Sequence, residues 1–305
     1  MHLKPRRAST DPRLRSLLQK ATRRGRLPIV ERVLARLDAI GDSTWLRSRV
    51  VVITFEESWP LAGAISIDKE LASKLAILTS VARAAKQKDA AGLGTLAHAY
   101  AEGDGSTLDD APDPRMIRLV AAALERPPAF FTWAFEQSRS EDSTAIIRSA
   151  QRYLSVATWP WDKAFILAGA LLAAVGNTPM TPVSTPGATE QDFPYWVALD
   201  KHTDEGKVAL KETSSELGVR YRQLIWASFY CESVRVNELL PSPWFRAERT
   251  WRLNKAGLSN ELAEQIWERA RPLLIARLAD EARSLRELVE SPIPARTVTR
   301  QASLL

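Results

Sequence analysis

The chain has little of the chemistry on which disulfide-rich and metal-binding proteins depend. Of its 305 residues, one is a cysteine, Cys231, and three are histidines. A single cysteine excludes an internal disulfide and fits the reducing cytoplasm, which is the predicted location. Because His and Cys are so few, a zinc site is not expected. We predict no metal and no cofactor.

Long apolar runs and a nucleotide-binding loop are also missing. The most apolar stretch, residues 164–175, is too short to cross a bilayer and predicts a buried core helix, so no membrane partner is expected. No apolar segment follows the basic N-terminus, as a secretory signal would require. Gly206-Lys207 is followed by Val208 and not by Ser or Thr, so the chain is not expected to be a self-sufficient P-loop ATPase.

Glycine is scarce, and apolar residues recur at helical spacing along most of the chain. We therefore predict an all-α fold, an orthogonal bundle of about ten helices. The expected helices are listed by residue number: 28–41, 45–57, 68–88, 114–125, 128–139, 141–156, 164–175, 195–217, 219–239 and 260–288. Residues 50–55 are rich in β-branched side chains, and a strand is the alternative there.

The chain length exceeds a usual single core and predicts one large or two moderate helical units. The expected division is a basic N-terminal arm with a helical domain (1–177), a Pro-rich linker or lid (178–194), and a C-terminal helical domain (195–305). The segment 178–194 holds four prolines, as a linker or an active-site lid would.

Positive charge is concentrated in the first 40 residues. They hold eleven Lys and Arg against three acidic residues, a net charge of +8, whereas the whole chain has +6. A basic arm on a nearly neutral remainder predicts a polyanionic partner, most commonly nucleic acid. The predicted phosphate contacts of the arm are Arg6, Arg7, Arg13, Arg15, Lys20, Arg23, Arg24 and Arg26. The alternative is a solvated tail with no partner.

Residues 17–62 resemble the C-terminal helical region of the RarA/MgsA-type clamp-loader-like AAA+ ATPases. The shared pattern is Lys20, Arg23 and Gly25, then Gly41-Asp42, then Arg47 and Arg49 before an apolar run and the acidic pair Glu56-Glu57. Ser58-Trp59-Pro60 departs from the small residues usual in that family, and the ATPase module is missing. The resemblance implies a helical collar, a link to DNA transactions, and a homo-oligomer or a separate ATPase partner.

A second informative segment is residues 193–207, where functional side chains are dense. On a continuous helix Trp196, Asp200, Thr203 and Lys207 share one face. Asp200 beside an aromatic wall is the first candidate for a catalytic carboxylate, with Lys201 as an amine nucleophile and His202 as a third candidate. The structural alternative is an ordinary helix surface, with Lys201 and Glu205 as an i,i+4 pair and Asp200 bound to a backbone group or an arginine.

Two tryptophan-containing breaks are candidates for base stacking. Trp161 and Trp244 each follow a proline at a break in the helical pattern, and Trp196 walls the Asp200 pocket. Arg246, Arg249 and Arg252 follow Trp244 and are further candidate phosphate contacts. The alternative for both tryptophans is hydrophobic packing at a helix start.

Two functions of different classes follow from these features. The first is a DNA-binding helical protein acting in DNA maintenance or genome defence. The second is an enzyme that flips a DNA base into the pocket of Asp200 and excises it by a glycosylase-like route. A protein–protein adaptor is a third and weaker alternative.

Overall fold

The computed structural model describes residues 10–66, 70–176 and 193–293, and this part of the chain is all-α. The predicted fold class is therefore confirmed, with more helices than the expected ten. The α-helices are α1 (Pro12–Arg23), α2 (Leu27–Ala39), α3 (Ser43–Ser58), α4 (Leu71–Arg83), α5 (Asp89–Ala101), α6 (Pro114–Glu125), α7 (Pro127–Gln137), α8 (Glu141–Tyr153), α9 (Pro160–Val175), α10 (Asp204–Glu216), α11 (Tyr221–Ser228), α12 (Pro243–Ala256), α13 (Asn260–Arg277) and α14 (Ala279–Glu290).

Short 3₁₀ and π segments join these helices. The 3₁₀ segments are η1 (Trp59–Ala64), η2 (Gly105–Leu108), η3 (Leu154–Val156) and η5 (Tyr195–Ala198), and a π-helical turn, η6 (Phe229–Ser233), continues α11. Within the described ranges, β-pairing is limited to two isolated bridges, Ser58 with Gln87 and Lys86 with Leu239. The predicted linker or lid falls almost wholly on residues 177–192, outside the described residues.

Helix starts explain why several boundaries were predictable from sequence. Asp113 and Ser140 accept hydrogen bonds from backbone N–H groups in the first turns of α6 and α8, and Pro114 occupies the first helical position of α6. The helices predicted at 114–125, 128–139 and 141–156 match α6, α7 and α8 within a few residues. Local capping chemistry fixes the starts of α6 and α8.

The β-branched run at residues 50–55 is helical, so the strand alternative is wrong. All side chains from Val50 to Ser58 are buried in α3. A helix that is covered on all sides needs no polar face, and its packing overrides the weak strand preference of Val and Ile.

Four predicted helices have different limits in the structure. The helix expected at 260–288 breaks at Leu278 into α13 and α14, and three others also differ. The helix expected at 68–88 ends at Arg83, and a second helix, α5, begins at Asp89. The helix expected at 219–239 stops in the π turn at Ser233, and α12 forms where no helix was predicted. In the third case residues 199–203 form a turn before α10, so the predicted helix at 195–217 is wrong in its first part.

Two hydrophobic cores hold the molecule together. The first joins α1, α2 and α4 to α10, α11, α13 and α14. The second is built around α5 and α9, with α6, α7, α8 and part of α12. The helix α3 serves both, because Val50 and Ile53 pack in the first core and Val51 and Phe55 in the second. Each core thus draws on both sides of the expected division at 178–194.

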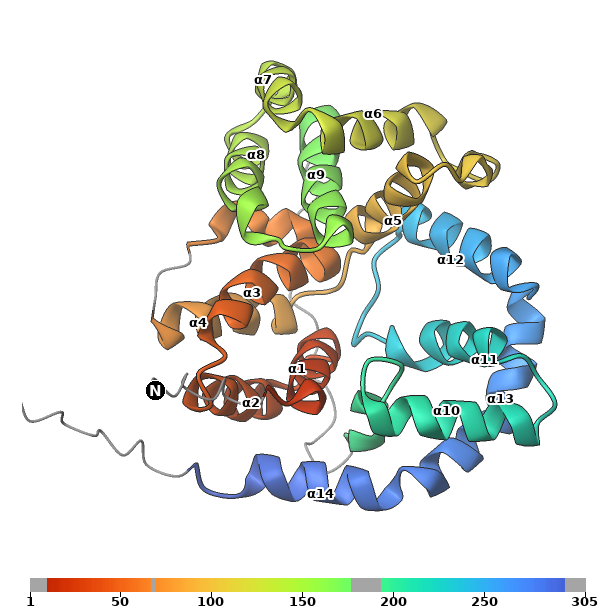
Figure 1. The fold of residues 1–305 in the computed structure, drawn as a ribbon. Helices are drawn as coiled ribbons and strands as arrows, with labels where there is room; N and C mark the ends of the chain where they lie inside the picture. The colour runs from red at the N-terminus through yellow and green to blue at the C-terminus, as the bar shows by residue number, and fades with distance from the viewer. Residues whose placement is uncertain (1–9, 67–69, 177–192, 294–305) are drawn as a thin grey trace, which may run out of the picture.

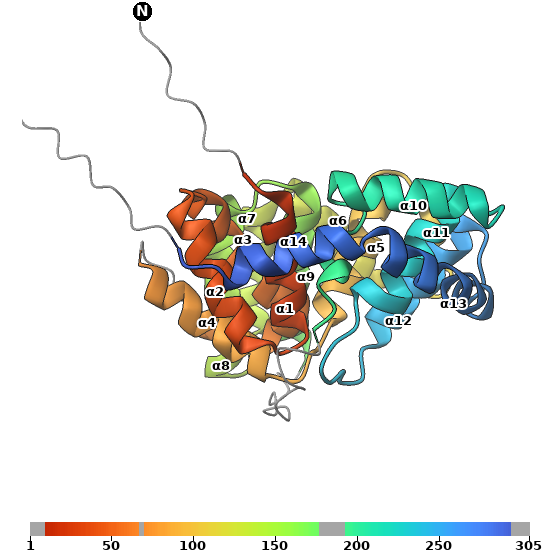
Figure 2. The ribbon, with the colours of Figure 1, turned by 90° about the horizontal axis from the view of Figure 1, so that it is seen from below.

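The arrangement of the helices brings distant segments together. In Figure 1 the red N-terminal helices α1 and α2 lie close to the blue α14, and Figure 2 shows α14 running across both. Arg36 of α2 donates hydrogen bonds to the carbonyl oxygens of Val289 and Ser291 at the end of α14. The helices α5, α9 and α12 lie on the opposite side of the molecule from α14 (Figure 1).

The first 40 residues do not form a free basic arm where the structure describes them. Residues 12–39 form α1 and α2, and Leu17, Leu18 and Leu34 are buried in the first core. The apolar stripe between the basic residues decides this outcome, because burying it requires α1 and α2 to dock. Residues 1–9, with Arg6 and Arg7, lie outside the described residues.

Candidate functional site

A buried ionic network occupies the region where α1, α3 and the segment after α4 meet. Glu57 is fully buried and accepts hydrogen bonds from Arg23 Nε at 2.6 Å and Lys88 Nζ at 2.9 Å. Arg23 also donates to Glu56 at 2.9 Å and to the carbonyl oxygen of Ser233. The guanidinium therefore links α1 to α3 and to the π turn.

Charge pairing decides the protonation state of Glu57. Burial alone would raise its pKa, but the cations Arg23 and Lys88 outweigh burial and lower the pKa to about 2. The carboxylate is thus ionised at neutral pH. The network stabilises the contact between the N-terminal helices and the rest of the molecule only while all three charges are present.

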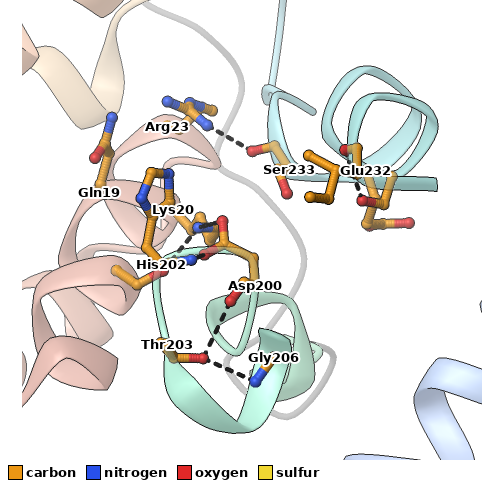
Figure 3. A network of polar contacts seen from close by, with 12 residues as sticks. Gln19, Lys20, Arg23, Asp200, His202, Thr203, Gly206, Glu232 and Ser233 are labelled. Atoms are coloured by element: carbon orange, nitrogen blue, oxygen red, sulfur yellow. Dashed lines mark hydrogen bonds and ion pairs between the residues drawn. The ribbon is translucent and has the colours of Figure 1, made fainter. Parts of the chain in front are cut away.

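Lys20 and Asp200 form a second ion pair beside this network. Lys20 Nζ lies 2.6 Å from Asp200 Oδ2 and 2.7 Å from Ser16 Oγ (Figure 3). The other carboxylate oxygen of Asp200 accepts the backbone N–H of His202 at 2.9 Å. Burial would raise the pKa of Asp200, but Lys20 overcomes that effect and lowers it. The carboxylate is ionised, and Lys20 neutralises it.

The turn that carries Asp200 is built by Thr203 and Gly206. Thr203 caps α10 by accepting the N–H of Gly206 at 3.1 Å (Figure 3). A Cβ on Gly206 would lie 2.1 Å from the carbonyl oxygen of Asp200, so only glycine allows this close return of the chain. The predicted helical face of Trp196, Asp200 and Thr203 is wrong, because the helix begins only after Thr203.

Asp200 and Trp196 nevertheless line one cavity, as expected from the sequence. Its other walls include Glu232 and Trp267, and Trp196 stacks on Trp267 with ring centroids 6.1 Å apart. The cavity measures about 20 Å³, close to the space that one water molecule needs. In this conformation it has no room for a nucleobase.

Most of the basic residues in the first 40 positions that were expected to contact phosphate pair instead with acidic side chains of the same chain. Lys20 and Arg23 are buried in the networks above, and Arg24 is bound to Glu232 at 2.9 Å. Arg13 pairs with Asp11 at 2.9 Å, and Arg15 pairs with Asp42 at 2.6 Å while lying over the ring of Trp45. Arg26 is partly buried and also has an interaction partner. Lys20, Arg23 and Arg24 therefore form ion pairs inside the fold and do not present free charges at the surface.

The predicted residues of α12 separate into three environments. Trp244 is buried in the second core, which matches the packing alternative for this residue. Arg246 is exposed, and Arg249 lies 3.3 Å from Glu264. Arg252 is partly buried among aromatic rings, and this environment was not expected.

These rings and cations form a continuous series, which we call the aromatic–cation ladder. It consists of His98, Trp161, Arg252, Trp226 and Lys201. His98 stacks on Trp161 with centroids 4.1 Å apart, and the Arg252 guanidinium lies 5.2 Å from the Trp161 ring and 4.6 Å from the Trp226 ring. Lys201 Nζ follows, 4.0 Å from the Trp226 centroid. The ladder connects α5 and α9 with α11, and so joins elements of both cores.

Arg252 is held in the ladder by a buried acid. Its Nε lies 3.4 Å from Glu248 Oε1, one helical turn earlier in α12, and the Tyr230 hydroxyl donates to the same oxygen. Burial raises the pKa of Glu248, and burial together with Glu248 raises the pKa of Tyr230 well above its usual value. This support fixes the guanidinium between the rings of Trp161 and Trp226.

The two ends of the ladder carry titratable groups whose pKa values burial lowers. Burial lowers the pKa of His98, and its buried Nδ1 has no hydrogen-bond partner within the described ranges. Burial also lowers the pKa of Lys201 to about 8. Trp159, the N-cap residue of α9, is 68% exposed and lies two residues before Trp161 in the chain. Trp161, Trp226, Arg252 and Lys201 are each partly exposed, so one ligand could contact several members of the ladder.

Sequence reasoning included three ladder members, Trp161, Lys201 and Arg252, but assigned them to separate sites. It missed His98, Trp226 and the supporting Glu248. The i,i+4 spacing of Glu248 and Arg252 and the aromatic cluster around Trp226 were visible signals. Only the packing of α11 against α12 brings them together.

Comparison of the chain with family models, with curated proteins and with solved structures found no match. Over the described ranges, no helix is long and apolar enough to cross a membrane. In the same ranges, His, Cys, Asp and Glu do not gather in a group of three or more that could hold a metal ion.

Proposed function

We propose that this protein binds DNA and that the aromatic–cation ladder is its contact surface for unpaired bases. The observation that carries the proposal is the alternation of aromatic rings and cations from His98 to Lys201, with the exposed Trp159 two residues before Trp161 in the chain. Unpaired bases stack on aromatic side chains, while Arg and Lys bind the phosphates of the same strand.

The ladder is a better candidate than the N-terminal basic residues. Lys20, Arg23 and Arg24 already have carboxylate partners, and breaking those pairs for a phosphate would leave buried acids unpaired. Arg252 also pairs with a buried acid, Glu248, but at 3.4 Å, and the Tyr230 hydroxyl donates to the same oxygen, so that acid would keep a partner. Lys201 has no carboxylate partner within the described ranges. Arg6 and Arg7 stay predicted phosphate contacts that could add affinity.

We further propose a role in DNA maintenance or genome defence. The support is the resemblance of residues 17–62 to the helical region of clamp-loader-like ATPases. Its marker residues Arg23, Glu56 and Glu57 form one buried network, so the shared pattern has a structural reason in this chain. A homo-oligomer or a separate ATPase partner belongs to the same proposal.

A binding titration with fluorescently labelled single-stranded and duplex oligonucleotides tests the proposal. Replacing Trp161 by Ala should weaken single-strand binding about 5- to 150-fold, the range for one base–aromatic stack worth about 1–3 kcal/mol. Arg252→Gln should also reduce the slope of log K on log salt by about 0.7, as loss of one single-strand phosphate contact would.

Trp45→Ala is the matched control, because Trp45 also packs against an arginine, Arg15, outside the ladder. This variant should bind like the wild type. Equal affinities for the wild type and Trp161→Ala, in proteins with unchanged circular dichroism, would reject the ladder as the contact surface.

The enzyme alternative keeps one supporting observation, the shared cavity of Asp200 and Trp196. A base could enter only if the cavity widened, and Lys20 would have to release Asp200. Asp200→Asn should abolish base excision from modified duplexes if this alternative holds. Excision by the variant at the wild-type rate would exclude Asp200 as the catalytic carboxylate.

A further inference from the structure

We propose that Lys201 is an amine nucleophile that forms an imine with an aldehyde, and that this aldehyde is the open-chain sugar of a base-free site in DNA. The identity of the ligand rests on the proposed DNA binding, whereas the reactivity of the amine does not.

The amine of Lys201 lies against ring faces and not against oxygen atoms. Its Nζ is 4.0 Å from the centroid of Trp226 and 4.3 Å from that of Phe229. Within the described ranges it makes no hydrogen bond and no ion pair. The deeply buried lysines differ, because each donates to oxygen: Lys20 to Asp200, Lys74 to the carbonyl of Glu70, Lys86 to three backbone carbonyls and Lys88 to Glu57.

The groups around Lys201 keep a substantial fraction of its amine neutral near physiological pH. Burial removes water from the ammonium, Arg252 and Lys20 oppose its charge, and Asp200 and Glu248 partly compensate; the resulting pKa is about 8. At pH 7.5 roughly a quarter of the amine is then neutral, against roughly a thousandth for an ordinary lysine. The neutral form is the nucleophile.

The covalent step balances without an oxidant or a reductant. The nitrogen lone pair attacks the aldehyde carbon, a C–N bond forms, and the carbonyl π electrons move to oxygen. A proton passes from nitrogen to oxygen, and the resulting carbinolamine loses its hydroxyl as water. Amine and aldehyde thus give an imine and one water molecule.

A base-free sugar fits this position better than a free aldehyde because of Arg252. The guanidinium and the amine lie over the same indole ring, that of Trp226, at 4.6 Å and 4.0 Å from its centroid. A strand whose phosphate binds Arg252 brings an adjacent sugar toward Lys201. At a base-free site the C1′ carbon of the sugar carries a hydroxyl in place of the base. The sugar ring can therefore open and expose an aldehyde, which an intact nucleotide cannot do.

Reductive trapping tests the proposal on the full-length protein. The wild type is incubated at pH 7.5 with a single-stranded oligonucleotide that carries one abasic site, with the intact oligonucleotide, or with glycolaldehyde, each with sodium cyanoborohydride. Peptide mass spectrometry then locates the adducts. We expect the abasic strand and glycolaldehyde to mark Lys201, and the intact strand to give no adduct.

Two variants make the result specific. Lys201→Arg keeps the positive charge and should lower the abasic-strand adduct at least tenfold. Lys207→Arg is the matched control, since Lys207 is exposed on α10 and paired with Asp204 at 2.9 Å; it should leave the adduct unchanged. The rate of glycolaldehyde trapping at Lys201 should rise through about pH 8, in step with its neutral fraction.

The outcomes separate this inference from the proposed function. If glycolaldehyde adducts were spread evenly over exposed lysines, the proposal that Lys201 is the nucleophile would be overturned. If Lys201 trapped glycolaldehyde but not the abasic strand, the proposal that a base-free DNA sugar is its ligand would be overturned. Affinity for the intact strand, measured with Trp161→Ala as above, reports on DNA binding alone and is independent of both results.

Discussion

At the scale of single residues, Asp89 shows how one carboxylate can serve two helices. It is the first residue of α5, and its Oδ1 accepts the backbone N–H of Trp244 at 2.8 Å, in the first turn of α12. In return, Ser242 Oγ accepts the N–H of Lys88 at 3.1 Å. Each helix start is thus capped from the other helix, and the α5–α12 contact that carries Arg252 is fixed at its base.

Asp89 gives a pH-dependent prediction. Burial raises its pKa to about 6, so the folded protein keeps this proton between about pH 4 and 6 while the unfolded chain loses it. The stabilisation from the neutral form is complete below about pH 4 and is lost as the pH rises through about 6. Asp89→Asn, which can still accept the N–H of Trp244, should therefore be more stable than the wild type above pH 6, by about 1–3 kcal/mol.

Urea unfolding at pH 4 and pH 7 measures this difference. The free energies of unfolding of wild type and Asp89→Asn should be similar at pH 4 and should diverge by pH 7. Asp113→Asn is the control, because Asp113 accepts an N–H in the first turn of α6 but is not buried. A constant difference at both pH values would show that Asp89 does not titrate in this range.

At the scale of secondary-structure elements, α5 is positioned by small residues. A Cβ on Gly92 would lie 2.4 Å from the backbone of Trp244 and Phe245, and one on Gly94 would lie 2.8 Å from the backbone of Ala164. The helix therefore meets α12 on one side and α9 on the other at backbone distance. This double contact brings His98 of α5 beside Trp161 of α9.

Replacing Gly92 by Ala should destabilise the protein by about 1–3 kcal/mol. Alanine is favoured over glycine within a helix by about 1 kcal/mol, so intrinsic propensity alone predicts the opposite sign. The clash with rigid backbone reverses it. Thermal unfolding followed by circular dichroism gives the sign, and Gly105→Ala, where no atom lies near the new Cβ, is the control. A stabilised Gly92→Ala variant would mean that α5 and α12 can separate at little cost.

At the scale of the whole molecule, the two hydrophobic cores are joined through α3. Adjacent residues of this helix enter different cores, as Val50 and Val51 do. The ladder and the Glu57 network cross the same boundary with polar contacts. The molecule should therefore unfold as one cooperative unit, although the chain is longer than most single-core proteins.

Phe55→Ala in the second core tests this cooperativity. The loss of a fully buried phenylalanine should cost about 3–5 kcal/mol. Cys231 packs against the first core, and burial raises its thiol pKa to about 11, so it should react slowly in the folded protein. The urea midpoint for Cys231 labelling should shift together with the midpoint from circular dichroism. A labelling midpoint that stays at the wild-type value would show that the cores unfold independently.

The sequence by itself determined the helical class and many helix ends, because those depend on local chemistry. Asp113, Pro114 and Ser140 cap or begin helices wherever the rest of the chain lies. It also marked Trp161, Lys201 and Arg252 as unusual residues. Local pattern could not show whether Arg23 lies on a surface or in the interior, since its partners Glu56 and Ser233 are 33 and 210 residues away.

Only the tertiary structure decided which of these residues share a site. The turn at Asp200 depends on the return of Gly206, and the ladder depends on α11 and α12 placing Trp226 beside Arg252. Burial then set the charges, raising the pKa of Asp89 and lowering that of Lys201. Such effects arise from neighbours that are distant in the chain, and a local pattern of residues carries no information about the water that folding removes.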